Sequence, residues 1–124
     1  APAATPAATA QALFQAPIVV VSHGTQTDPI FNYGNQTALD LWELDWPTFT
    51  QTPSRSTAEP EEHRDREQLL QNAKTHGYIS DYQGIRISCT GRRFRIANVI
   101  LWEVLDETNH RCGQAATFDQ WEFL

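Results

Sequence analysis

The stretch Phe94–Leu105, FRIANVILWEVL, decides the fold of this 124-residue chain. It is long and almost wholly apolar, which predicts a β-strand at the centre of a sheet. Strand patterns flank it over residues 79–89 and 112–118. Residues 90–92 and 106–110 are rich in turn-forming side chains and separate the three. The last third of the chain therefore predicts a three-stranded antiparallel meander.

Two shorter strands are predicted near the start. Residues 18–22 form a β-branched run, residues 30–33 form a second apolar run, and residues 23–29 between them consist of turn formers. We expect these two strands to pair antiparallel.

Three helices are predicted between the strand groups. Asn35 is a suitable N-cap for a helix that carries Ala38, Leu41 and Trp42 at helical spacing. A second, short helix is predicted from residue 45. A longer one begins at residue 56 or 57 and ends at Gly77, a typical residue at a helix C-terminus.

Strands and helices that occur in separate groups indicate an α+β fold rather than alternating βαβ units. We expect an antiparallel sheet of about five strands with short helices packed on one face. Residues 1–10, an Ala/Pro/Thr repetition, are expected to form a flexible arm, and residues 11–124 a single domain.

The central strand is apolar on both faces, although helices can cover only one. Simple alternation puts Ile96, Ile100, Trp102 and Val104 on one face and Ala97, Val99, Leu101 and Leu105 on the other. The second face needs cover from the arm or from another copy of the chain. We expect a homodimer whose interface includes Leu13, Phe14, Val99 and Leu101.

Composition argues against several classes of function. The net charge of −6 disfavours binding to a phosphate backbone, so we expect no nucleic-acid partner. No apolar run approaches 20 residues, so we expect no membrane span. Cys89 and Cys112 are expected at opposite ends of a strand and hence as free thiols, which suits a cytoplasmic protein.

No catalytic or metal constellation is visible. Ser22, His23 and Asp28 suggest a triad, but adjacent strand residues point to opposite faces, so we interpret His23 and Asp28 as fastening the loop. The four histidines and two cysteines are scattered and do not show ligand spacing for a metal. We expect no enzyme; a small enzyme using His23 or Cys89 is the weakest alternative.

Several blocks of residues resemble the MEKHLA domain family over residues 17–118. They are SHGT at 22–25, DPIFNYGN at 28–35, PSR at 53–55, AE at 58–59, GIRIS at 84–88, GRRFRI at 91–96 and GQAATF at 113–118. The resemblance implies a PAS-like fold and a sensory or regulatory role, of the stand-alone bacterial kind. It provides no catalytic residues to transfer.

The PAS likeness also implies a possible flavin. Flavin-binding light sensors of that superfamily have an Asn-Cys-Arg stretch where this chain reads Pro53-Ser54-Arg55. Arg55 could meet a phosphate, but Ser54 replaces the thiol that forms the photoadduct. A flavin sensor unable to form a cysteine adduct is therefore one alternative.

The favoured hypothesis is a sensor with a small ligand pocket between sheet and helices. Asn98 and Gln114 are expected on inner faces, where a buried amide needs partners. The full set of candidate ligand-binding residues is Tyr33, Asn35, Trp42, Arg55, Asn98, Trp102 and Gln114. The alternative is a dimerisation module without a ligand, in which the same aromatic residues are ordinary core.

Overall fold

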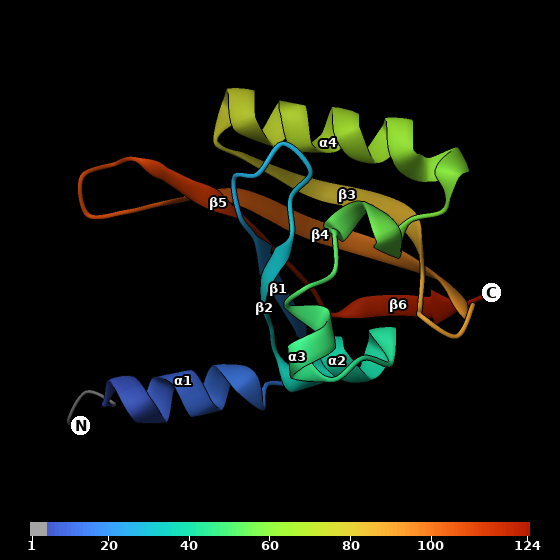
Figure 1. The fold of residues 1–124 in the computed structure, drawn as a ribbon, viewed down its shortest axis with the longest axis horizontal. Helices are drawn as coiled ribbons and strands as arrows, with labels where there is room; N and C mark the ends of the chain where they lie inside the picture. The colour runs from blue at the N-terminus through green and yellow to red at the C-terminus, as the bar shows by residue number, and fades with distance from the viewer. Residues whose placement is uncertain (1–4) are drawn as a thin grey trace.

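The computed structural model describes residues 5–124 and consists of one antiparallel sheet with helices on one face (Figure 1). The sheet order is β2-β1-β5-β4-β3. Strand β6 also pairs with β4, along the part of β4 that β5 does not reach. The strands are β1 (Val19–His23), β2 (Phe31–Gly34), β3 (Tyr78–Ile87), β4 (Arg93–Leu105), β5 (Arg111–Phe118) and β6 (Gln120–Phe123). The predicted α+β class, the antiparallel meander and the segregated helices are confirmed.

The helices lie mostly between β2 and β3 in the chain. In Figure 1, α4 lies along β3 at the top of the view, and α2 and α3 lie together at the bottom. Their bounds are α1 (Pro6–Phe14), α2 (Gln36–Trp42), α3 (Trp46–Phe49), α4 (His63–His76) and the 3₁₀ turns η1 (Ser54–Thr57) and η2 (Pro60–Glu62).

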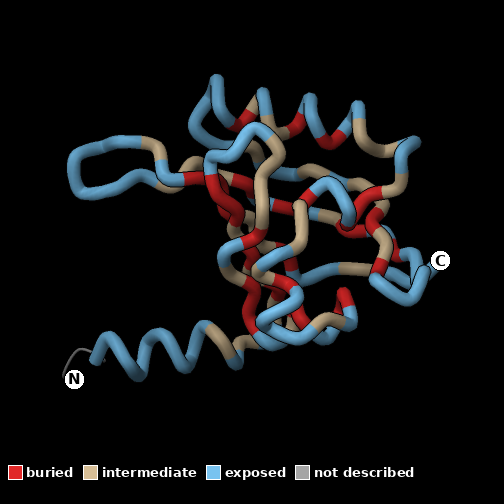
Figure 2. The backbone as a smooth tube through the Cα atoms, in the orientation of Figure 1, coloured by how far each residue is buried: buried red, intermediate tan, exposed pale blue. Residues whose placement is uncertain are grey.

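The N-terminal segment differs from the expectation of a flexible arm. Helix α1 begins at Pro6, with the Thr5 hydroxyl capping the amide of Ala8 at 3.1 Å. Alanine has the best helix propensity, and proline is tolerated in the first turn, so the Ala/Pro repetition is compatible with a helix. No residue of α1 is buried, and Figure 2 shows the helix almost entirely exposed. Residues 1–4 of the expected arm lie outside the described residues.

An aromatic cluster forms the centre of the core. Trp42 from α2 packs edge-on against Phe94 of β4 and Phe118 of β5, with ring centroids 5.5 and 6.2 Å apart. Phe31 and Phe49 stack at 4.3 Å beside it. Trp42 is 3% exposed and Phe49 and Phe94 are fully buried, so the cluster fastens α2 and α3 to the sheet.

Two bulges change which side chains of β3 and β4 face the helices. Asp81 and Asn98 have left-handed backbones, with φ of 61° and 53°, and the β3–β4 register shifts beside each of them. Before Asn98, Phe94 and Ile96 are buried; after it, Val99 and Leu101 are buried and Ile100 is 44% exposed. The extra residue in a bulge reverses the inward parity of the strand.

This reversal corrects the simple alternation read from the sequence. Asn98 was expected on the inner face with Ile96 and Ile100, but it is exposed. Val99 and Leu101 were expected at a dimer interface, but they lie in the core.

Strand β4 changes partner at the same point. Residues 94–97 pair with β6, residues 100–105 pair with β5, and the Asn98 amide donates to Gln120 Oε1 at 2.7 Å. Strand β6 was not expected from the sequence.

Gly113 is required by a close approach between β5 and the end of β1. Its φ is +151°, and a Cβ there would collide with the backbone oxygen of His23. Gly113→Ala should lower the free energy of unfolding by roughly 3 kcal/mol, because backbone strain and a backbone clash add. Urea denaturation measures this.

Gly91→Ala is the matched control. Gly91 has a φ of +88°, but a Cβ there would meet open space, so only the left-handed backbone cost of about 1 kcal/mol applies. An equal loss of unfolding free energy in Gly113→Ala and Gly91→Ala would show that the close approach to His23 does not make Gly113 necessary.

Candidate functional site

A partly open cavity of about 70 Å³ lies between the sheet and the helices. Its walls are mostly apolar and come from all strands except β6 and from α2, η1 and α4. They include Val21, Phe31, Leu69, Ile96, Val99 and Leu101. Because the bulge at Asn98 reverses which side chains of β4 face the helices, Val99 and Leu101 point toward this cavity.

Two arginines reach the cavity from opposite elements. Arg66 of α4 is 6% exposed, and its guanidinium donates a hydrogen bond to the Ser54 hydroxyl of η1. Arg86 of β3 is 7% exposed and donates to the Ile85 carbonyl at 2.9 Å and to the Tyr82 hydroxyl at 3.3 Å. Burial, and next the charge of Arg86, lower the pKa of Arg66 from its ordinary value.

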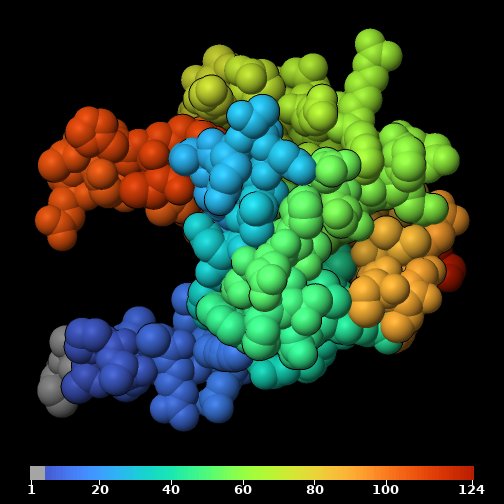
Figure 3. Space-filling model, viewed as in Figure 1, coloured from blue at the N-terminus to red at the C-terminus, as the bar shows by residue number. Residues whose placement is uncertain are grey.

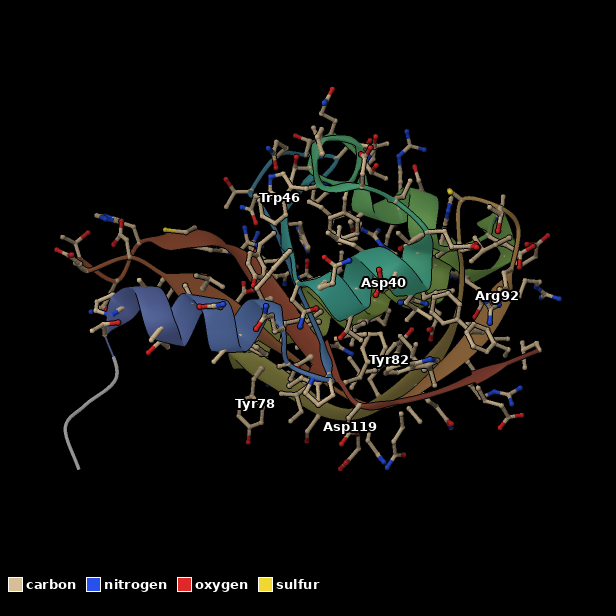
Figure 4. All side chains as sticks on the ribbon, turned by 90° about the horizontal axis from the view of Figure 1, so that it is seen from below. Asp40, Trp46, Tyr78, Tyr82, Arg92 and Asp119 are labelled. Carbon is tan, nitrogen blue, oxygen red and sulfur yellow. The ribbon has the colours of Figure 1, made fainter. Side chains whose placement is uncertain are left out.

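Tyr82 closes the cavity between β3 and α4. Its hydroxyl donates to Asp65 Oδ2 at 2.5 Å, and burial is the main reason that its pKa is raised. In Figure 4 Tyr82 lies on the helix-covered side of the sheet and Tyr78 on the opposite side. Gly84 lies between Tyr82 and Arg86 on the same face of β3, and a side chain there would crowd both groups.

His23, at the end of β1, lines the cavity and has an unpartnered ring nitrogen. Its Nδ1 lies 3.1 Å from the Gly24 carbonyl oxygen, which can only accept, so Nδ1 carries the proton. Nε2 is then a bare acceptor, and it is buried without a hydrogen-bond partner among the described residues. Burial lowers the pKa of His23 from its ordinary 6.5, so the ring is neutral near pH 7.

Trp42 supplies the second unpartnered group. Its indole Nε1–H is buried and finds no acceptor among residues 5–124. Buried polar groups normally have a partner, and both of these orphaned groups belong to side chains that line the same cavity. Two side chains that line the cavity therefore each have one buried polar atom without a partner, one a donor and the other an acceptor.

A second hollow lies outside the cavity, against the exposed side of α4. This groove of about 210 Å³ shares Arg66 and Leu70 with the cavity, so those two residues border both spaces. Its remaining charged residues are Asp28, Arg55, Glu67, Lys74 and Arg111.

The structure brings one of the seven predicted ligand residues, Trp42, into the cavity. Arg55 pairs with Asp28 at 2.8 Å and lines the outer groove. Gln114 is 2% exposed, donates to the Leu70 carbonyl at 3.0 Å and lines the same groove.

The other four predicted residues lie elsewhere. Asn35 is fully buried, but its side chain bonds the backbones of Leu13, Ile18, Val20 and Ala38, so it joins α1, β1 and α2. Tyr33 packs edge-on against Trp46 at 5.7 Å. Trp102 lies on the outer face opposite Tyr78 and Ala115, and Asn98 is at the exposed bulge.

Of the four predicted interface residues, two lie on α1 and two are buried in β4. Leu13 is 42% exposed, and Phe14 packs edge-on against Trp46 at 6.2 Å. Val99 and Leu101 line the cavity and are 2% and 5% exposed, so they are not available to a partner.

Sequence reasoning missed Ser54, Arg66, Tyr82 and Arg86 as cavity residues. A signal existed for Arg66, which lies three, four and seven residues before the apolar stripe Leu69, Leu70 and Ala73, and thus on the buried face of α4. A signal also existed in β3, where Tyr82 and Arg86 share a face by alternation.

The comparisons with known proteins agree on family and fold. A family model described as MEKHLA domain matches residues 1–123. No curated protein sequence matches the chain. The structure is similar to a PAS domain from Colwellia psychrerythraea, with a TM-score of 0.77 and 13% identity over 94% of this chain and 93% of that one.

Two further solved structures are similar. One is a light-oxygen-voltage domain studied with a flavin analogue, with a TM-score of 0.72 and 14% identity over 94% of this chain and 84% of that one. The other is the ethanol-bound PAS domain of a LuxR-family transcriptional regulator from Burkholderia thailandensis, with a TM-score of 0.68 and 20% identity over 93% and 96%. The fold is that of PAS domains.

The residues present do not fit a flavin. The cavity of about 70 Å³ is less than half of the ~150 Å³ that takes one benzene ring, and a flavin has three fused rings. Arg55 is paired with Asp28 outside the cavity, and Cys89 and Cys112 are exposed and do not line it.

Among residues 5–124, no group of three or more His, Cys, Asp or Glu side chains is arranged to hold a metal ion. Within the same residues, no helix is long and apolar enough to cross a membrane.

The buried His23 predicts a dependence of stability on pH. Its pKa is lower in the folded than in the unfolded chain, so protons favour unfolding as the pH falls below 6.5. His23→Gln cannot be protonated, and the stability advantage of the wild type over this variant should shrink from about pH 7.5 to about pH 5.5. Urea denaturation at both pH values measures it.

The exposed His76 provides the control, because His76→Gln should keep the wild-type dependence. An unchanged difference between wild type and His23→Gln across this range would show that His23 is not buried in its neutral form.

Proposed function

The chain belongs to the MEKHLA domain family, and on that premise we propose that it is a sensory domain that takes a small molecule into its cavity. The observation that carries the proposal is that His23 and Trp42, which line one cavity, each have a buried polar atom without a partner among the described residues. A ligand would supply the partners that the protein itself leaves out. The similar Burkholderia domain with bound ethanol supports a ligand of a few atoms.

Strand β4 would transmit the binding of a ligand in the cavity to the outer face of the sheet. Val99 and Leu101 line the cavity, and between and after them Ile100 and Trp102 point to the opposite, outer face. A shift of this strand would therefore alter both faces together. Val99 directly follows the Asn98 bulge, where the strand is already distorted and changes partner. No step of this function requires catalysis.

The compartment that we propose is the cytoplasm. Cys89 and Cys112 are exposed free thiols, and such thiols persist in reducing compartments.

Filling the cavity should weaken ligand binding. Ala116→Leu adds three carbon atoms to a half-buried wall residue, whereas Ala12→Leu makes the same change on exposed α1. Ethanol, n-propanol, propionamide and propionate are titrated while the Trp42 indole ¹H–¹⁵N signal is followed, with Trp42→Phe assigning it. At least one compound should shift that signal in wild type and in Ala12→Leu, and bind at least tenfold more weakly, by about 1.4 kcal/mol, in Ala116→Leu.

The proposal fails if no compound in this panel shifts the Trp42 signal. It also fails if Ala116→Leu binds as tightly as the wild type, because the ligand would then lie elsewhere.

A second candidate function is homodimerisation through the outer sheet face. Tyr78 and Ile100 are 62% and 44% exposed on that face, beside the half-buried Trp102. The apolar exposure supports an interface, and Leu13 and Phe14 of α1 remain proposed parts of it. In Figure 3, α1 and the β4–β5 turn project from one side of the body with open space between them.

Ile100→Glu should convert such a dimer to a folded monomer, because it places a charge in the apolar face. Sedimentation velocity over a range of concentrations measures the effect, and Thr108→Glu in the exposed β4–β5 turn is the control. A wild type that stays monomeric at its highest soluble concentration would rule out this second function.

A further inference from the structure

Two arginines share the cavity without a counter-ion. Arg66 and Arg86 are 6% and 7% exposed, and both line the cavity. The ion pairs within residues 5–124 involve Arg55, Arg93, His110 and Arg111, and none involves either cavity arginine.

The hydrogen-bond partners of these arginines are neutral. Arg66 donates to the hydroxyl of Ser54, and Arg86 donates to the Ile85 carbonyl and the Tyr82 hydroxyl. The negative groups that act on Arg66, Glu67 and Asp28, belong to the outer groove and do so without contact. Asp65 reaches Arg86 only through the Tyr82 hydroxyl, and no carboxylate contacts either guanidinium directly. Buried charges in proteins are normally paired, so the two guanidinium groups could take up a further anion.

The cavity limits what that anion can be. About 70 Å³ is roughly half the ~150 Å³ that accommodates the six carbon atoms of benzene, so the ligand can have only a few non-hydrogen atoms. Most of the wall is apolar, with Leu69, Ile96 and Val99 among its residues, and suits an alkyl group rather than a second charge.

From these observations we propose that the ligand is a short-chain monocarboxylate, whose carboxylate is held by Arg66 and Arg86 and whose alkyl chain lies against the apolar wall. The proposal rests on the proposed sensory function and names the class of ligand for its cavity. Guanidinium groups pair with carboxylates through planar, charge-assisted hydrogen bonds. Trp42 also lines the cavity, and its buried indole N–H has no acceptor among the described residues, so it is a further group that could donate a hydrogen bond to a carboxylate oxygen.

The outer groove provides an approach for an anion. It is lined by Arg55, Arg66, Lys74 and Arg111 against Asp28 and Glu67, although the chain as a whole carries a net charge of −6. Arg55 is paired with Asp28 and Arg111 with Glu103, which leaves Arg66 and Lys74 against Glu67. A small excess of positive charge on an acidic protein attracts anions locally. Because Arg66 and Leu70 border both spaces, movement of these two side chains would connect the groove to the cavity.

Matched ligands test the charge requirement. Propionate, the nearly isosteric but neutral propionamide, and nitrate, which is planar and anionic but has no alkyl chain, are titrated by calorimetry at constant ionic strength in sodium chloride. Propionate should bind at least tenfold more tightly than either of the others. It should also shift the Trp42 indole signal.

Matched variants test the two arginines. Arg66→Met and Arg86→Met should each weaken propionate binding at least tenfold, while Arg95→Met, on an exposed side chain, should not change it. Without ligand, the Tm of the two cavity variants should be no lower than that of the wild type, because each removes an uncompensated buried charge. A merely structural role of these arginines predicts a lower Tm instead.

The outcomes separate this inference from the function on which it rests. Equal binding of propionamide, or binding of ethanol or n-propanol without propionate, would overturn the carboxylate assignment and leave a small-molecule sensor. Nitrate binding as tightly as propionate would overturn the alkyl requirement. Failure of every compound to shift Trp42 would overturn both proposals.

Discussion

The left-handed backbone at Asn98 is the constraint on which the rest of this molecule depends. One extra residue reverses the inward parity of β4, so Phe94 and Ile96 face the helices before it and Val99 and Leu101 face them after it. The same point separates the part of β4 that pairs with β6 from the part that pairs with β5. A regular strand would turn Ile100 and Trp102 into the cavity and leave its present wall in solvent.

Much of the fold could be predicted from the sequence, because its signals are local. Turn residues at 90–92 and 106–110 delimit the meander, Asn35 caps α2 as expected, and Gly77 ends α4. The predictions of strand facing and of the N-terminal segment were wrong because no local sequence signal distinguishes the alternatives there. A bulge at an asparagine looks like regular alternation, and the helix over residues 6–14 looks like low-complexity sequence.

The candidate site was harder to predict than the fold. Trp42 was expected in the pocket because an aromatic on an apolar helix face is buried. Arg66 and Arg86 were not expected, since arginine is almost never fully buried and composition gives no reason to place two of them inside. Their burial depends on segments distant in sequence, such as Ser54 for Arg66, and such contacts exist only after the chain has folded.

The second bulge, at Asp81, affects how molecules of this kind can meet. Strand β3 is an outer strand of the sheet, and its unpaired backbone groups would otherwise accept a strand from a neighbouring molecule. A kink and a carboxylate in its first half interrupt that row, because a straight incoming strand cannot stay in register across them. Edge-to-edge polymerisation is thereby disfavoured in a protein that leaves apolar side chains exposed on a broad sheet face.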